Sequence, residues 1–161
     1  MRGGALPAAL LCAAFGFLLA FAPRRALAPA LGLLAAVAIA GTWLPVRGPW
    51  IEVAFLACWS VLILACATIH LPRGVPAWLA LGLAPIAGLA AGAVIAGDGA
   101  RPDLVRALPC VLVCLPARWI VARGWQIGIK VVSSWLIAVA LLAALLPSMA
   151  KTPGYVPDHM D

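Results

Sequence analysis

Apolar segments of about twenty residues, separated by short stretches of charge, proline and glycine, run through almost the whole of this sequence. The hydrocarbon core of a bilayer is ~30 Å thick, and a helix needs ~20 apolar residues to cross it. We expect spans over residues 5–22, 26–46, 50–70, 77–97, 104–121 and 127–146. The pattern predicts an all-α, polytopic integral membrane protein with about six short transmembrane helices.

The composition excludes most other classes of protein. Hydrophobic residues make up 66% of the 161 residues and charged residues only 10%, whereas soluble domains are typically ~45–50% apolar and ~25% charged. A soluble domain of this length has too much surface to hide that much apolar side chain. The net charge of +6 comes from scattered basic residues, so we expect a lipid bilayer as partner and no nucleic acid.

Short connections between the segments predict an up-and-down bundle that forms a single domain over residues 1–161, with 147–161 as a solvated tail. The fifth span is the weakest, because its charge-free stretch is short and contains Pro109 and Pro116. The first segment has some features of a signal peptide. However, Pro23 would directly follow the cleavage site, and the apolar run exceeds the usual ~7–15 residues, so we expect a retained span.

The distribution of basic residues gives a weak orientation signal. Five Lys or Arg residues fall on the side of the termini and six on the other, while all five acidic residues fall on the side of the termini. Following the rule that basic loops stay in the cytoplasm, we expect both termini outside. The wealth of alanine and proline, with few lysines, suggests a high-GC bacterium. We therefore expect a multi-pass protein of a bacterial inner membrane with periplasmic termini.

Ionisable and hydroxyl groups inside the spans are candidates for function, because burying charge in a bilayer costs several kcal/mol. Glu52 is a candidate cation or proton site, but it also suits the N-terminus of a helix, where the dipole favours a carboxylate. Lys130 enters the last span and can instead extend back to the interface. Ser60, Thr68, Ser133 and Ser134 could line a polar path, or simply bond to carbonyls one turn earlier.

Other motifs indicate packing rather than chemistry. The spacing of Gly88 and Gly92 in the fourth span is typical of close helix approach or dimerisation. The two histidines, His70 and His159, form no paired haem or metal motif, and the five cysteines fall within spans as small apolar residues. We therefore expect no catalytic residues, no metal site and no cofactor, and we do not expect an enzyme.

The third span and its flanks are similar to those of a known family. Gly41-Thr-Trp-Leu-Pro-Val precedes Trp50-Ile-Glu-Val-Ala-Phe, followed by Ser60-Val-Leu-Ile-Leu-Ala and His70-Leu-Pro-Arg-Gly. This order resembles the hydrogenase/urease accessory membrane proteins of the HupE/UreJ type, and the last span from Lys130 resembles the family's closing helix. The resemblance covers roughly residues 10–148 and implies a small nickel- or cobalt-permease-like protein. The family's histidine- and aspartate-bearing metal motif is absent, so only Glu52 and Ser60 carry over.

Two functions therefore remain open. The first is a small permease or permease-related protein, working as a homo-oligomer because six short helices enclose little volume. The second is a non-catalytic membrane subunit or assembly factor of a larger membrane complex, which suits apolar helices with little buried charge. The two differ in whether Glu52, Ser60, Thr68, Ser133 and Ser134 converge on one interior cavity.

Overall fold

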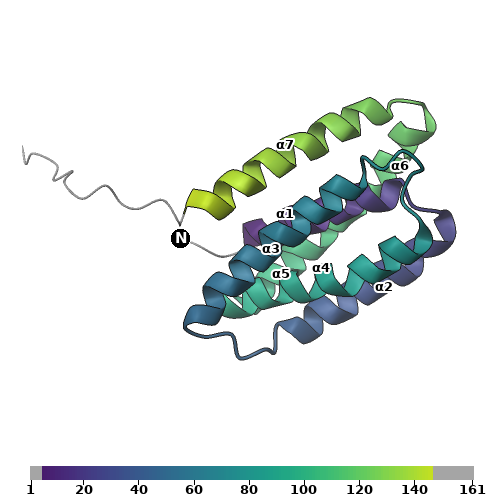
Figure 1. The fold of residues 1–161 in the computed structure, drawn as a ribbon. Coiled ribbons are helices and arrows are strands. Elements are labelled where there is room, and N and C mark those ends of the chain that lie inside the picture. The colour runs from purple at the N-terminus through teal and green to yellow at the C-terminus, as the bar shows by residue number, and fades with distance from the viewer. Residues whose placement is uncertain (1–4, 147–161) are drawn as a thin grey trace, which may run out of the picture.

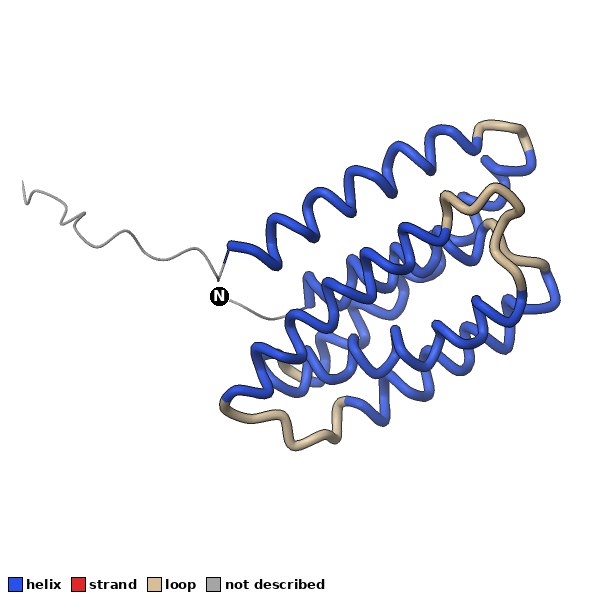
Figure 2. Tube along the Cα trace, in the orientation of Figure 1, coloured by secondary structure: helices blue, strands red, loops and turns tan. Residues whose placement is uncertain are grey.

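Each of the expected apolar segments forms helix in the computed structural model, which describes residues 5–146 (Figure 1). The elements are α1 (Ala5–Ala20), α2 (Arg24–Gly41), α3 (Pro49–Thr68), α4 (Ala77–Asp98), α5 (Arg101–Ala107), the 3₁₀ helix η1 (Leu108–Val113), α6 (Cys114–Ala122) and α7 (Gln126–Leu145). Within these residues there is no strand (Figure 2), which confirms the all-α class. The predicted tail at 147–161 lies outside the described residues.

Five helical stretches are long and apolar enough to cross a membrane. They are α2, α3, α4, the continuous stretch from α5 through η1 to α6, and α7. Helix α1 is apolar but has 16 residues, which at 1.5 Å per residue gives roughly 24 Å. The weak fifth span is therefore long and apolar enough to cross, and the shortest of the six expected spans is the first.

Helix α1 lies at the centre of the bundle. It packs against α3, α4 and the whole α5–η1–α6 stretch, and ten of its sixteen residues are buried. Leu11, Phe15 and Leu18 are among the largest side chains in the chain that are completely enclosed. The core of the molecule therefore follows the axis of α1.

Successive helices alternate in direction, as the short loops predict, but the most extensive contacts join helices that run the same way. Helix α2 packs most extensively on α4, and α1 on the α5–η1–α6 stretch. Helices α1 and α2 adjoin in sequence but are not among the extensively packed pairs. Short loops thus set the direction of each helix without deciding which helices pack together.

The parallel contact between α2 and α4 depends on glycine. A Cβ atom at Gly88 would lie 2.5 Å from the carbonyl oxygen of Leu34. A Cβ atom at Gly92 would overlap the carbonyl oxygen of Ala38 and lie 2.8 Å from the Cα of Gly41. Real Cβ atoms do not approach other atoms this closely. The two glycines of α4 therefore serve packing within one chain, with backbone against backbone.

Two features of the helices differ most from the sequence expectation. The second span was expected to reach Val46, but α2 ends at Gly41. The Thr42 side chain donates a hydrogen bond to the carbonyl of Ile39, and the chain then turns through residues 42–48. The fifth span changes to 3₁₀ geometry over η1, where Pro109 lacks the amide that an α-helix would use.

We expect Gly92→Ala to destabilise the protein, because the added methyl group must push α2 away from α4. Overpacking of this kind costs about 1–3 kcal/mol. Gly82→Ala is the matched control on the same helix, since a Cβ atom there meets nothing within 4 Å. Unfolding of both variants in detergent, followed by tryptophan fluorescence, checks this. Equal stability of the two variants would contradict the close α2–α4 contact.

Candidate functional site

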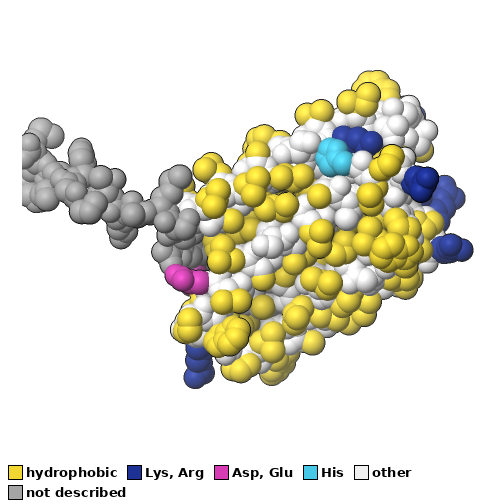
Figure 3. All heavy atoms as spheres, viewed as in Figure 1, with side chains coloured by type: hydrophobic (Ala, Val, Ile, Leu, Met, Phe, Trp, Pro, Cys, Tyr) yellow, Lys and Arg dark blue, Asp and Glu magenta, His cyan; other side chains and the backbone are white. Residues whose placement is uncertain are grey.

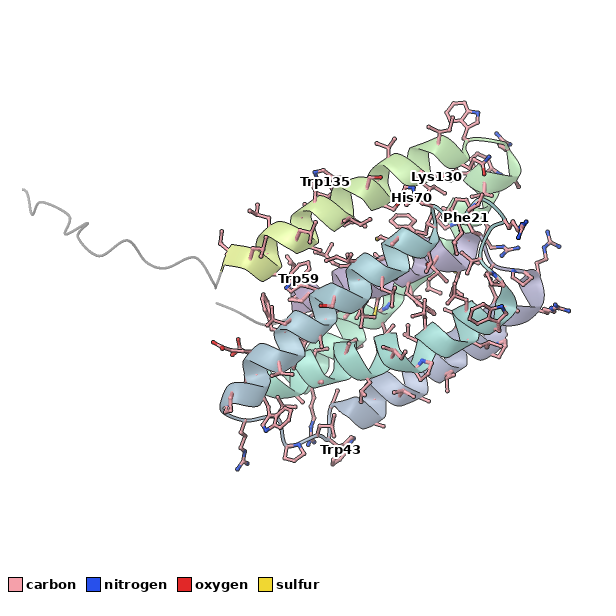
Figure 4. All side chains as sticks on the ribbon, in the orientation of Figure 1. Phe21, Trp43, Trp59, His70, Lys130 and Trp135 are labelled. Atoms are coloured by element: carbon pink, nitrogen blue, oxygen red, sulfur yellow. The ribbon has the colours of Figure 1, made fainter. Side chains whose placement is uncertain are left out.

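Two of the predicted polar residues, Ser133 and Ser134, meet His70 at the junction of α3 and α7. The imidazole Nε2 of His70, just beyond α3, lies 3.1 Å from the Ser133 hydroxyl and 3.4 Å from the Ser134 hydroxyl of α7. Both hydroxyls donate to the carbonyl of Lys130, at 2.9 and 3.0 Å. Figure 4 shows His70 and Lys130 near each other at one end of this helix pair.

The geometry of this cluster suits helix packing better than catalysis. Because both serine protons point to the Lys130 carbonyl, the Ser133 oxygen is left to accept the Nε2–H of His70. Ser133 is fully buried, and no carboxylate from the described residues hydrogen-bonds to the cluster. The cluster therefore fastens α7 to the end of α3, as interhelical hydroxyl and imidazole bonds do in membranes.

The remaining predicted polar residues lie elsewhere. Thr68 is buried, and its hydroxyl donates to the carbonyl of Ala65 at 2.7 Å, which is the local bond that such residues often make. Ser60 is exposed on the outer side of α3. Glu52 is exposed near the opposite end of the same helix. The six candidates thus do not converge on one interior cavity.

The interior of the bundle is filled with apolar side chains. Among the described residues, Thr68 and Ser133 are the only buried polar or charged ones. Two tryptophans lie in the middle of helices. Trp59 is buried, and its ring makes an edge-to-face contact with Phe55. Its indole Nε1 has no hydrogen-bond partner in the described part of the chain. The other, Trp135, is exposed on α7 (Figure 4). Residues 5–146 contain no group of three or more His, Cys, Asp or Glu that could hold a metal.

A large apolar hollow lies between α6 and α7, and we name it the α6–α7 groove. Its volume is about 710 Å³, and Phe17 of α1 forms its floor. Its other lining residues, all from the α6–α7 region, include Trp119, Gly124, Trp125, Ile127 and Gly128. Helices α6 and α7 are joined by a three-residue loop yet make little contact with each other. The groove is therefore an opening in the side of the bundle.

Two glycines line this groove: Gly128 lies on α7, and Gly124 lies in the loop before it with a positive φ of 83°, a conformation that favours glycine. A Cβ atom at Gly124 or at Gly128 would meet nothing within 4 Å among the described residues. Trp119 and Trp125, at the groove, are 58% and 77% exposed. Trp119 and Trp125 lie close together in the sequence, and they are the signal by which this surface could have been found.

Arg118 has a structural role that sequence reasoning missed. Its guanidinium Nη1 donates to the carbonyls of Leu19 and Ala22, at 3.3 and 2.8 Å, where α1 ends. The last carbonyls of a helix have no intrahelical partner, and the helix dipole makes that end negative. Arg118 therefore caps the central helix from α6 instead of extending into the interface.

The comparisons with known proteins give no family assignment. No protein-family model, curated protein or solved structure matches this chain.

We expect Arg118→Ala to destabilise the protein by about 2 kcal/mol, because it removes two charge-assisted hydrogen bonds at the end of α1. Arg118→Lys keeps the charge but not the forked geometry, so its stability should lie between those of the parent protein and Arg118→Ala. Arg123→Ala is the control, since its guanidinium only stacks on the Trp119 ring at 3.8 Å. Denaturant unfolding in detergent measures the stability of all three variants. A larger loss of stability in Arg123→Ala than in Arg118→Ala would contradict the capping role.

Proposed function

We propose that this chain is a non-catalytic membrane subunit that assembles with a different membrane protein, one helix of which docks in the α6–α7 groove. The observation that carries the proposal is the apolar groove itself, where Trp119 and Trp125 are more than half exposed and Gly128 of α7 leaves open space. Helices in lipid associate mainly by close packing at small residues. The close-approach positions Gly88 and Gly92 of α4 are already occupied by α2 within the chain.

The position of α7 supports the same proposal. Of the five long helical stretches, α7 is the least buried within the chain, and it packs mainly on α3. Its outer face presents Val131 and Trp135, both more than half exposed. A partner helix in the groove would bury one flank of α7, and the His70–Ser133 contact would hold the other flank against α3.

The filled interior favours a subunit over a lone permease. A permease needs polar groups lining a path, whereas the core around α1 is apolar within the described residues. Glu52 and Ser60, the two residues that the HupE/UreJ resemblance carries over, are exposed on α3 and do not face this core. Transport of nickel or cobalt is the competing function, and the experiment below includes a measurement of it.

The charges favour one orientation in the membrane. At the end that carries the α1–α2, α3–α4 and α6–α7 loops, the described residues include six basic and no acidic side chains. At the opposite end, the described residues include three basic and three acidic side chains. Because basic loops remain in the cytoplasm, we place the all-basic end there, in a bacterial inner membrane.

We expect a photo-crosslinking residue placed at Ile127, in the groove, to form one discrete adduct with a second protein in intact cells. The same residue at Leu33 of α2 or Ile86 of α4, both exposed on other faces, should give no such adduct. Gly128→Leu should abolish the Ile127 adduct, because the larger side chain fills the close-approach position. Mass spectrometry of the adduct identifies the partner.

Several results would contradict the proposal. An adduct between two copies of this chain would indicate a homo-oligomer instead of a subunit of a mixed complex. Equal crosslinking at all three positions would show that the groove is not a docking site. Uptake of nickel or cobalt by vesicles containing only the purified chain, lost in Glu52→Gln, would establish the permease.

A further inference from the structure

Basic side chains collect at one end of the bundle without acidic counterparts. We call this end, formed by the loops at 21–23, 69–76 and 123–125, the basic end. Six basic residues lie there: Arg24, Arg25, Arg73, Arg118, Arg123 and Lys130. The described acidic residues, Glu52, Asp98 and Asp103, all lie toward the other end. In Figure 3 most of the visible Lys and Arg side chains lie at the basic end, beyond an apolar belt.

A cavity of about 630 Å³ opens at the basic end, between the α1–α2 and α3–α4 loops. Arg25 from the first turn of α2 and Arg73 from the α3–α4 loop both line it. Neither guanidinium forms an ion pair with another described residue. The cavity therefore brings together two positive charges, from segments almost fifty residues apart, with no protein anion between them.

The start of two parallel helices adds to this positive potential. Pro23 precedes α2 and Pro76 precedes α4, and both prolines line the cavity. Neither can supply a side-chain acceptor to the first amides of its helix, and neither helix has a side-chain cap. Because α2 and α4 run in the same direction, their positive dipole ends lie at the same level of the bundle.

The rest of the cavity wall is apolar and lies at the level of the membrane interface. Phe21, Val75 and Trp78 line it together with the two arginines. Trp78 is 72% exposed, and tryptophan is enriched where head groups meet acyl chains. Helix α2, with 18 residues, is roughly 27 Å long, so its first turn lies at one boundary of the ~30 Å hydrocarbon core.

We infer that this cavity binds the phosphate-bearing head group of an anionic phospholipid. Guanidinium groups carry the charge opposite to that of a phosphate diester, and their forked N–H donors match its two free oxygens. The apolar wall suits the glycerol and first acyl carbons of a lipid, which a free phosphate ion lacks. The site is independent of the α6–α7 groove, which is lined by other residues.

The test is native mass spectrometry of the full-length protein in detergent, titrated with phosphatidylglycerol and, separately, phosphatidylcholine. We expect preferential retention of phosphatidylglycerol. Each of Arg25→Gln and Arg73→Gln should weaken that binding about fivefold, the equivalent of ~1 kcal/mol per basic side chain at an anionic surface. Arg123→Gln is the matched control, at the same end but outside the cavity. A Lys substitution at Arg25 or Arg73 keeps the charge and should retain most of the binding.

Three outcomes would overturn the inference. The first is equal affinity for the two lipids. The second is a loss of phosphatidylglycerol binding in Arg123→Gln as large as in the cavity variants, which would indicate general attraction to the basic end instead of a specific site. The third is displacement of phosphatidylglycerol by millimolar inorganic phosphate, which would assign the cavity to the free ion. Because a Gln variant could be misfolded, its unfolding curve is compared with that of the parent protein, and the Lys variants provide a second test.

Discussion

The structure depends on the burial of α1 along the axis of the bundle. This helix carries no charged residue, and other helices surround most of it. In a bilayer, every backbone polar group must find a partner within the protein, and the last carbonyls of a helix have none of their own. Arg118 supplies that partner for Leu19 and Ala22. The packing and the capping of α1 together fix where α6 lies.

The irregular fifth crossing fits the same constraint. A Cβ atom at Gly16 would lie 2.6 Å from the carbonyl of Val111, so the backbones of α1 and η1 nearly touch. Pro109 removes one amide from the regular helical ladder, and the chain adopts the tighter 3₁₀ geometry there. Close approach at glycine thus recurs on both sides of the molecule, at Gly16 and at Gly88 and Gly92.

The sequence was sufficient to predict the helical class and the direction of each crossing, because apolar length and short loops determine both. It was not sufficient to predict which helices pack together. Loops set direction only, whereas neighbours are chosen by small residues such as Gly16 and Gly92, whose partners lie far along the chain. The extent of the fifth crossing was underestimated for a related reason, because prolines were counted as breaks although 3₁₀ geometry accommodates Pro109.

The same limit applies to the candidate site. Composition and spacing singled out Ser133 and Ser134, but the proximity of His70 depends on α7 packing against α3 and is not visible along the chain. Nothing local in the sequence reveals that the partners of Arg118 are carbonyls at the end of the first helix. Both examples are contacts between distant segments, which periodicity and spacing do not encode.

The features that could support function lie on the outer surface of the bundle. The α6–α7 groove and the arginine-lined cavity both open on the outside of the bundle, while the interior holds side chains such as Phe15 and Leu62. The proposed function and the inferred lipid site both depend on these surface features. The central claim is therefore that no aqueous path passes through the core around α1.

Maleimide labelling of the native cysteines in membranes tests this claim most directly. Thiols react with maleimide as hydrated thiolates, and Cys12 and Cys58 are fully buried beside the axis of the bundle. We predict that both stay unmodified in native membranes and react after denaturation in SDS, while a control cysteine in Gln126→Cys, at the basic end, reacts in both states. Modification of Cys12 or Cys58 in native membranes at a rate close to that of the control would reveal an aqueous path and contradict the account.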